Sequence, residues 1–219
     1  MESEESLRRY YAARAQEYDA VYAKPERQAD LRIMEDWVPD IMSGKRILEV
    51  ACGTGYWTQF LAPQAASILA TDAAEETLEI AKRRGDTKKV DFCLADAYAL
   101  PDPKDPFDGA FAGFWLSHVP LQRLRQFLDG LHAKLAPESV VLFLDNLFVE
   151  GNSTPIAEHD AEGNAYQRRK LRDGTFHRVL KNFPSEADLE NMIEGIGTNP
   201  QYRKFTYYWG FHYKTPPLR

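Results

Sequence analysis

The residues RILEVACGTGYWTQFL, 46–61, form the most informative segment of this chain. It begins with a short apolar run, residues 46–50, that is typical of a buried strand. Gly53 and Gly55 follow where the backbone has to turn sharply, because glycine alone adopts left-handed conformations at little cost. Beyond Gly55 apolar side chains recur at helical spacing, so the turn opens a helix whose first N–H groups lack partners within the helix. The sequence therefore predicts a strand, a tight turn and a helix that together cradle a ligand.

The residues around this turn indicate which kind of ligand it holds. The dinucleotide fingerprint G-x-G-x-x-G requires a third glycine where this chain has Thr58. Glu49, just before the turn, suits a ligand with positive charge better than a pyrophosphate. Two later apolar runs end in carboxylates, Asp72 and Asp96, and parallel sheets bind ligands at the carboxyl ends of their strands. A small cationic nucleoside fits these residues better than a dinucleotide does.

The series formed by residues 49–55, Asp72 and Asp96 resembles the successive motifs of class I S-adenosylmethionine-dependent methyltransferases in both order and spacing. The resemblance covers residues 40–145. It implies S-adenosylmethionine (SAM) as the cofactor and S-adenosylhomocysteine (SAH) as its product. It also implies that the glycine turn lies against the methionyl part, that Asp72 holds the ribose hydroxyls and that Asp96 reaches the adenine amino group. The cofactor-binding residues expected on this basis are Tyr11, Tyr18, Glu49, Ala51, Cys52, Gly53, Gly55, Trp57, Thr58, Asp72, Ala73, Asp96, Ala97, Phe114 and Trp115.

One residue departs from the family pattern, because Ala51 stands where the first glycine usually lies. A methyl group is tolerated there only if the residue keeps ordinary backbone angles, so we expect such angles at Ala51.

Predicted strands alternate with predicted helices, which favours an α/β, doubly wound, mostly parallel sheet with helices on both faces. The resemblance implies a Rossmann-like sheet of seven strands whose last strand is antiparallel. We expect a single domain over 1–219, with an N-terminal helical lid over 1–43 and a cofactor-binding core over 44–149. Residues 150–219 then form a substrate-facing insertion and the C-terminal strands, including one strand over 204–213.

Composition excludes several function classes. The formal net charge of -6 and the pI of 5.5 argue against electrostatically driven nucleic-acid binding. Two cysteines support neither a disulfide framework nor a zinc cluster, so no metal is expected. An acidic N-terminus and the lack of a long apolar run predict no signal peptide, no membrane association and a cytoplasmic location. A small-molecule substrate is expected, with monomer and homodimer both open.

The N-terminal segment supports two interpretations. Residues 7–22 predict an amphipathic helix, in which tyrosines at helical spacing are ordinarily explained by burial. In related methyltransferases a Tyr-Tyr…Ala…Tyr-Asp helix closes over the cofactor, and Tyr10-Tyr11…Ala15…Tyr18-Asp19 resembles it. A second helix over residues 31–41 is predicted to end near Pro39.

Candidate acceptor residues lie at the ends of the fourth and fifth strands. Phe114 and Trp115 offer apolar walls, as methyl transfer requires a desolvated, in-line approach. His118 either deprotonates the acceptor or has the structural role that a histidine-x-proline pair has in related enzymes, fixing the start of the following helix. Asp145 and Asn146 either contact the acceptor or act as ordinary turn formers.

The segment after the fifth strand is the natural place for substrate selection. Residues 150–163 predict a long polar loop, in which His159 and Asp160 form either a metal or acid–base pair or part of a solvated loop. A basic run then precedes a hairpin signal at Asp173-Gly174. Its arginines either line a charged hairpin edge or recognise a carboxylate or phosphate on the acceptor. These arginines are Arg168, Arg169 and Arg172.

These features predict SAM-dependent methyl transfer to a small molecule by in-line displacement, with the accepting N, O, S or C atom open. Two rivals use the same cofactor motifs. One transfers or cyclises the aminocarboxypropyl chain of the cofactor, and the other is a catalytically silent binding domain. Protein methylation also stays open, whereas a nicotinamide dehydrogenase is disfavoured by Thr58 and Glu49.

Overall fold

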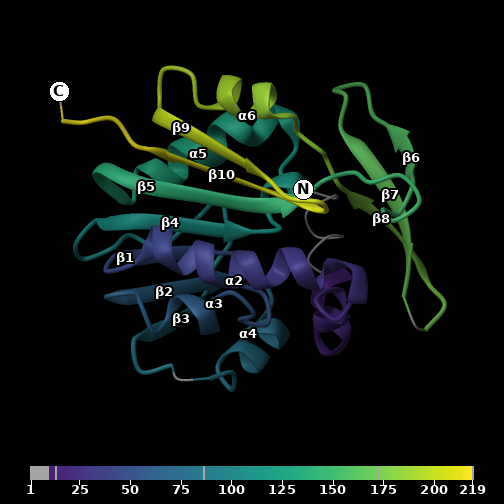
Figure 1. Cartoon of the computed structure of the whole chain (residues 1–219), viewed down its shortest axis with the longest axis horizontal. Helices are drawn as coiled ribbons and strands as arrows, with labels where there is room; N and C mark the ends of the chain where they lie inside the picture. Colours follow the sequence, from purple (N-terminus) through teal and green to yellow (C-terminus); the bar gives the residue numbers. More distant parts are fainter. Residues whose placement is uncertain (1–9, 13, 86, 172, 219) are drawn as a thin grey trace.

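The computed structural model describes residues 10–12, 14–85, 87–171 and 173–218. Its main sheet has seven strands in the order β3-β2-β1-β4-β5-β10-β9 (Figure 1). Neighbouring strands are parallel except that β10 runs antiparallel to both β5 and β9. This arrangement confirms the predicted Rossmann-like sheet. The strands are β1 Arg46–Val50, β2 Ser67–Asp72, β3 Val90–Leu94, β4 Phe107–Gly113, β5 Leu135–Asn146, β9 Thr198–Lys204 and β10 Tyr208–Lys214.

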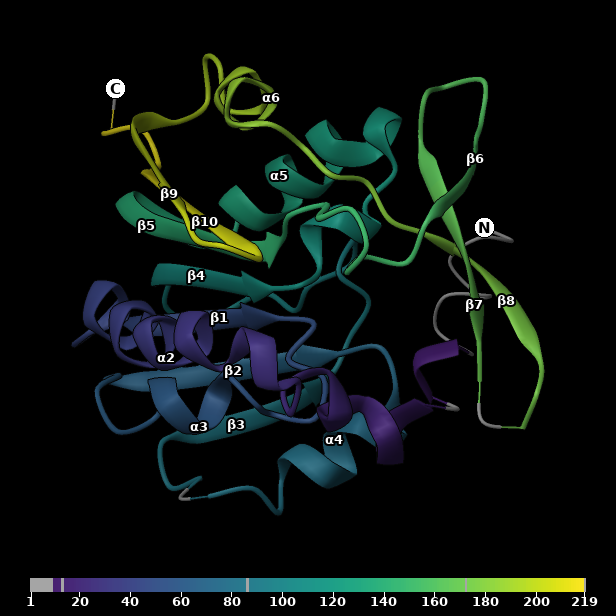
Figure 2. The ribbon, with the colours of Figure 1, turned by 45° about the vertical axis from the view of Figure 1, so that its right-hand side comes forward.

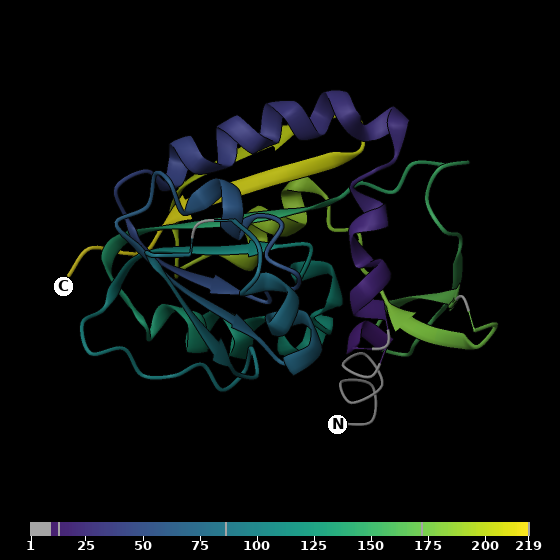
Figure 3. The same ribbon diagram turned by 90° about the horizontal axis from the view of Figure 1, so that it is seen from below.

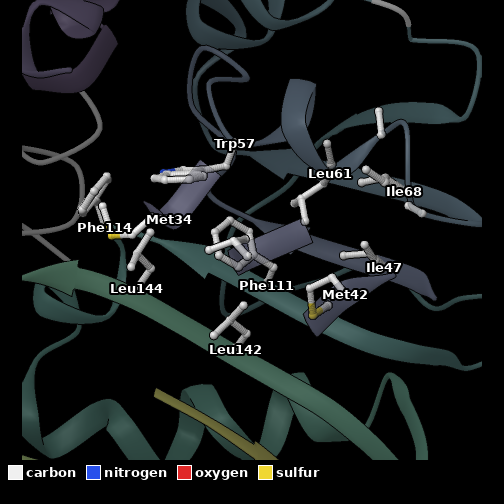
Figure 4. Close-up of a cluster of buried hydrophobic side chains, with 14 of the residues drawn as sticks. Met34, Met42, Ile47, Trp57, Leu61, Ile68, Phe111, Phe114, Leu142 and Leu144 are labelled. Atoms are coloured by element: carbon white, nitrogen blue, oxygen red, sulfur yellow. The ribbon is translucent and has the colours of Figure 1, made fainter. Parts of the chain in front are cut away.

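Helices cover both faces of this sheet, as Figure 3 shows from below. On one face α2 and α3 pack on a cluster that includes Met34, Leu61 and Phe111 (Figure 4). On the other face α5 and α6 pack on a cluster around Phe127, Phe143 and Trp209. The helices are α2 Gln28–Met42, α3 Thr58–Leu61, α4 Glu75–Ala81, α5 Leu124–His132 and α6 Glu186–Met192; the short 3-10 helices are η1 Ala15–Val21, η2 Pro25–Arg27, η3 Leu116–His118 and η4 Leu121–Arg123.

Helix α2 continues past Pro39, so the predicted end near that residue is wrong. Leu31, Met34, Val38 and Met42 are at most 1% exposed, and they keep the helical spacing on both sides of the proline. Burying such a side chain stabilises by roughly 1.5–3 kcal/mol, and several of them together outweigh the roughly 3 kcal/mol cost of an interior proline.

The strand predicted over residues 204–213 is in fact two strands, β9 and β10. They are joined by a tight turn in which the Phe205 N–H donates to the Tyr208 carbonyl at 2.9 Å. Aromatic residues favour strands on both sides of this turn, and no glycine, proline or asparagine lies between Lys204 and Tyr208 to indicate the reversal.

A second sheet of three strands stands beside the main sheet (Figure 2). It contains β6 Ile156–His159, β7 Ala165–Lys170 and β8 Phe176–Leu180. The antiparallel pairing of β7 with β8 across Asp173-Gly174 confirms the predicted hairpin. The long loop predicted over 150–163 is wrong in its second half, because β6 pairs with β7 there. Among the described residues, none of the helices has both the length and the apolar character needed to cross a membrane.

The N-terminal segment is helical at residues 10–12 and forms the 3-10 helix η1 at Ala15–Val21. The part of the predicted helix over 7–9 lies outside the described residues. This segment, purple in Figure 3, runs between the main sheet and the sheet of β7 and β8. Its position brings three chain segments that are distant in sequence to one place.

Candidate cofactor and acceptor site

The glycine turn lies at the carboxyl end of β1, between β2 and α4. Gly55 has a φ of +76°, and a Cβ atom there would lie 3.0 Å from the Ala81 Cβ. A side chain at this position would therefore strain the backbone and collide with α4. The turn is held by the Cys52 N–H, which donates to the Thr71 carbonyl at 2.9 Å.

The expectation of ordinary backbone angles at Ala51 is wrong, because its φ is +54°. The residue thus adopts the left-handed conformation of the family's glycine while carrying a methyl group, which costs about 1–2 kcal/mol. The hydrogen bonds of the neighbouring turn residues hold it there.

Asp72 ends β2 and binds the turn itself. Its Oδ2 atom accepts from the Gly53 N–H at 2.8 Å, and its Oδ1 atom accepts from the Ala74 N–H and the Thr77 hydroxyl, each at 2.9 Å. Burial raises the pKa of this carboxyl. The backbone N–H groups of Gly53, Ala73 and Ala74 and the Thr77 hydroxyl oppose this shift, because they favour the ionised form.

Glu49 is 1% exposed and faces Thr58, whose hydroxyl donates to the Glu49 Oε2 atom at 2.7 Å. Burial raises the pKa of this carboxyl to about 8. The group is therefore mostly protonated at neutral pH, and a positively charged ligand beside it would favour the ionised form.

The remaining expected cofactor residues are placed as follows. Asp96 follows β3 at the surface, and its carboxylate accepts from the Tyr98 N–H at 2.8 Å. Trp57 is 3% exposed and packs beside Phe114 in the core (Figure 4). Trp115 is half-buried, and its indole N–H has no hydrogen-bond partner among the described residues. Cys52 and Ala73 are half-buried and Ala97 is buried.

Polar and aromatic contacts hold the N-terminal segment against the glycine turn and the residues that follow it. The Thr54 hydroxyl donates to the Asp19 Oδ1 atom at 2.6 Å, and Arg84 forms an ion pair with the same carboxylate. Tyr22 stacks on Tyr56 with ring centroids 3.5 Å apart. These contacts bring Tyr18 and Tyr22 close to the strand ends.

A cavity of about 440 Å³ lies beneath this segment. Its walls come from the N-terminal segment, the loop after β5, β7 and the end of β8, together with Phe114 and Tyr208. It brings together the predicted residues Tyr11, Tyr18, Phe114, His118, Asn146, Arg168 and Arg169. Arg172, also expected here, lies outside the described residues.

Charge in the cavity wall is strongly positive. One carboxylate residue, Glu17, is among the described residues that line it. The cationic side chains of the wall are Arg14, Lys24, Arg27, Arg168, Arg169, Lys170 and Lys181.

His118 is buried and both of its ring nitrogens have partners. Its Nδ1 atom donates to the Leu180 carbonyl at 2.6 Å, and its Nε2 atom accepts from the Tyr11 hydroxyl at 2.8 Å, which fixes a neutral ring. Burial lowers the pKa of His118 well below its usual value. The ring thus joins the second sheet to the N-terminal segment, and a role as general base would require Tyr11 to be displaced first.

Asp145 is fully buried and pairs with Lys181, whose Nζ atom lies 2.6 Å from the Asp145 Oδ1 atom. The same ammonium donates to the Ser117 hydroxyl at 2.6 Å. Burial raises the pKa of Asp145, but the charges of Lys181 and His118 and the hydrogen bonds from Lys181 and Ser117 together outweigh it and hold this pKa below its usual value. Asp145 does not line the cavity, whereas Lys181 and Asn146 do.

Two residues of the wall were not indicated by the sequence. Arg27 is 8% exposed and donates to the side-chain oxygens of Asn146 at 2.9 Å and Asn152 at 2.6 Å. Lys181 is 4% exposed. Neither stands in a motif, although a lysine directly after the apolar pair Val179-Leu180 is a weak sign of a buried charge.

His159 and Asp160 do not form a metal or acid–base pair. The Asp160 carboxylate caps its own turn, accepting from the Asn164 N–H at 2.8 Å and the Tyr166 hydroxyl at 3.1 Å. Across the described part of the chain, no group of three or more His, Cys, Asp or Glu side chains could hold a metal ion.

Comparisons with known proteins agree with this geometry. A family model described as a methyltransferase domain matches residues 47–138. A DhpI–SAH complex is 29% identical, with a TM-score of 0.81 over 98% of this chain and 97% of that one. A DhpI–SAM–HEP complex is 30% identical, with a TM-score of 0.79 over 96% and 97%.

A malonyl-[acyl-carrier protein] O-methyltransferase of Halorhodospira halophila is 33% identical over 143 residues, which are 63% of this chain and 46% of that relative. The chain belongs to the class I S-adenosylmethionine-dependent methyltransferases, whose cofactor is SAM.

Proposed function

We propose that this protein transfers the methyl group of SAM to a small-molecule acceptor held in the cavity beneath the N-terminal segment. The observation that carries the proposal is the position of this cavity. Phe114 at the end of β4 and Asn146 at the end of β5 line it, so it lies at the strand ends where open parallel sheets bind ligands.

The residues of the turn fit the cofactor. Gly55 leaves no side chain between β1 and α4, and the Asp72 carboxylate lies against the turn, where it would accept from a ribose hydroxyl. In this proposal Asp96 reaches the adenine amino group and Glu49 lies near the positively charged methionyl part. When bound, SAM supplies a methyl group made electrophilic by the sulfonium charge.

The chain itself contributes positioning and exclusion of water. Residues 1–43 act as the lid, residues 44–149 hold the cofactor and residues 150–219 face the acceptor. Closure of Tyr11 and Tyr18 over the cavity removes water, which favours a reaction in which charge is dispersed as the methyl group moves. Asp145, fully buried, acts through Lys181 rather than on the acceptor.

Support for a second ligand beside the cofactor comes from DhpI, which forms a complex with SAM and HEP together. The cytoplasmic location expected from the sequence is part of this proposal and needs its own localisation experiment.

Calorimetric titration with SAH, with NADH in parallel, tests the cofactor part of the proposal. We expect SAH to bind and NADH not to bind. Asp72→Ala should weaken SAH binding by about 1–3 kcal/mol, or roughly 5–150-fold, because it leaves a desolvated hydroxyl without its acceptor. An unchanged SAH affinity in this variant would contradict the ribose assignment.

A further inference from the structure

Three cationic side chains of the cavity wall, Arg27, Arg169 and Lys181, form a group that we call the cation cluster. They come from η2, β7 and the residue after β8, and all three line the same cavity. The positive charges of Arg169 and Arg27 lower the pKa of Lys181, in the same direction as burial, so the three cations lie close enough to repel one another.

The two arginines are oriented by neutral groups. Arg27 donates to the amide oxygens of Asn146 and Asn152, and Arg169 donates to the Gln167 Oε1 atom at 2.7 Å and 3.0 Å. Amide oxygens fix a guanidinium without cancelling its charge. Among the described residues no carboxylate lies within ion-pair distance of Arg27 or Arg169.

The cluster also has unused hydrogen-bond donors. The Nε–H of Arg27 is buried and has no partner among the described residues. The Lys181 ammonium has three donors, and two of them are used by Asp145 and Ser117. Buried donors without partners and buried charges without counter-ions both cost free energy, and an anionic ligand would remove both costs.

We propose that the acceptor is a small organic acid, and that one anionic oxygen of the acid, held by Arg27, Arg169 and Lys181, takes the methyl group directly. This inference rests on the proposed function. The oxygen lone pair forms a bond to the methyl carbon as the carbon–sulfur bond breaks, and the electron pair of that bond stays on sulfur. The products are SAH and a methyl ester with one negative charge fewer than the acid.

No proton moves in this reaction, so it needs no general base, and His118 is not free to act as one. The His118 nitrogens are both engaged, by Leu180 and Tyr11. An ammonium or alcohol acceptor would have to lose a proton before or during methyl transfer, whereas a carboxylate or phosphonate is already a nucleophile at neutral pH.

Titration of the SAH-saturated protein with small probes tests the inference. Methylphosphonate and propionate should bind, and propionamide and ethylamine should not. A preference for methylphosphonate would assign a tetrahedral dianion, and a preference for propionate would assign a carboxylate; both support an oxyanion site. Binding of ethylamine, or equal binding of propionate and propionamide, would overturn it.

Substitution of single arginines locates the site. Arg169→Gln should weaken binding of the anionic probe at least tenfold, and Arg27→Gln is the second variant if the first does not fold. The matched control is Arg178→Gln, since Arg178 lies on the adjacent strand, pairs with Glu158 and does not line the cavity. Equal anion affinity in wild type and in a folded cluster variant would overturn the assignment.

A rival occupant of the cluster is the carboxylate of the cofactor itself. In that case Arg169→Gln would weaken SAH binding but leave binding of methylthioadenosine, which lacks this carboxylate, unchanged. That pattern would overturn the acceptor assignment while leaving the proposed function standing. Failure of the wild-type protein to bind SAH would instead contradict the proposed function.

Discussion

The buried carboxyl of Glu49 makes the stability of this protein depend on pH. Its pKa is raised by burial to about 8, above its ordinary value of 4.5. The native state therefore binds more protons than the unfolded state between these two values, and stability falls as pH rises through this window and levels off above it.

The contribution of this one group follows from the two pKa values. Between pH 5 and pH 8 it lowers the free energy of unfolding by about 3.5 kcal/mol, since each full pH unit within the window costs about 1.4 kcal/mol. Glu49→Gln removes this contribution while leaving an amide oxygen to accept from the Thr58 hydroxyl. Asp72 also has a raised pKa and is present in both proteins, so their difference reports Glu49 together with its repulsion by Asp72.

Urea denaturation at pH 5, 6, 7 and 8 measures the effect. The difference in unfolding free energy between Glu49→Gln and wild type should grow in favour of the variant by about 3.5 kcal/mol over this range. The solvent-exposed Glu76→Gln is the control and should follow wild type throughout. Parallel pH profiles for Glu49→Gln and wild type would show that Glu49 does not have a raised pKa in the folded protein.

Three further predictions concern packing and the lid. Gly55→Ala should lower the free energy of unfolding, measured in urea, by about 2–4 kcal/mol, because the added methyl group both strains the left-handed backbone and collides with Ala81. The control is Gly130→Ala in α5, where the space is open, and it should raise the free energy of unfolding by about 1 kcal/mol. Asp145→Ala should lower the free energy of unfolding by roughly 3–5 kcal/mol, since it leaves the Lys181 ammonium buried without its partner. A loss below about 1 kcal/mol would mean that water reaches the pair. Tyr11→Phe removes the hydroxyl that donates to His118, so the proposed lid should be held less firmly and SAH binding should weaken about tenfold. Calorimetry that shows wild-type SAH affinity in this variant would contradict a lid role.

The glycine turn and the carboxylate at the end of β2 were predictable from the sequence because their signals are local. Two glycines in a turn after an apolar strand, and a carboxylate where the next strand ends, are fixed by short-range geometry. The structure places Gly55 and Asp72 as the motifs indicate. The backbone angle at Ala51 could not be predicted, because the hydrogen bonds that hold its neighbours come from β2.

The cavity proposed to hold the acceptor was only partly predictable, because it is assembled by tertiary packing. Arg27 and Lys181 are 154 positions apart in the chain, and no spacing rule connects them. Arg169 was indicated by the basic run, but the same run contains Arg168, which is exposed and lies over the Phe176 ring. Sequence alone does not tell which arginine of a hairpin is turned inward, since that depends on strand register.

The identity of the nucleoside released from SAM distinguishes methyl transfer from its rivals. Wild-type protein would be incubated with SAM and a panel of small acids, and the products separated by liquid chromatography with mass detection. We predict SAH in equimolar amount with a methylated acid, and neither product in a reaction without acceptor. Formation of methylthioadenosine in place of SAH would show that the aminocarboxypropyl chain is transferred or cyclised, and would contradict methyl transfer.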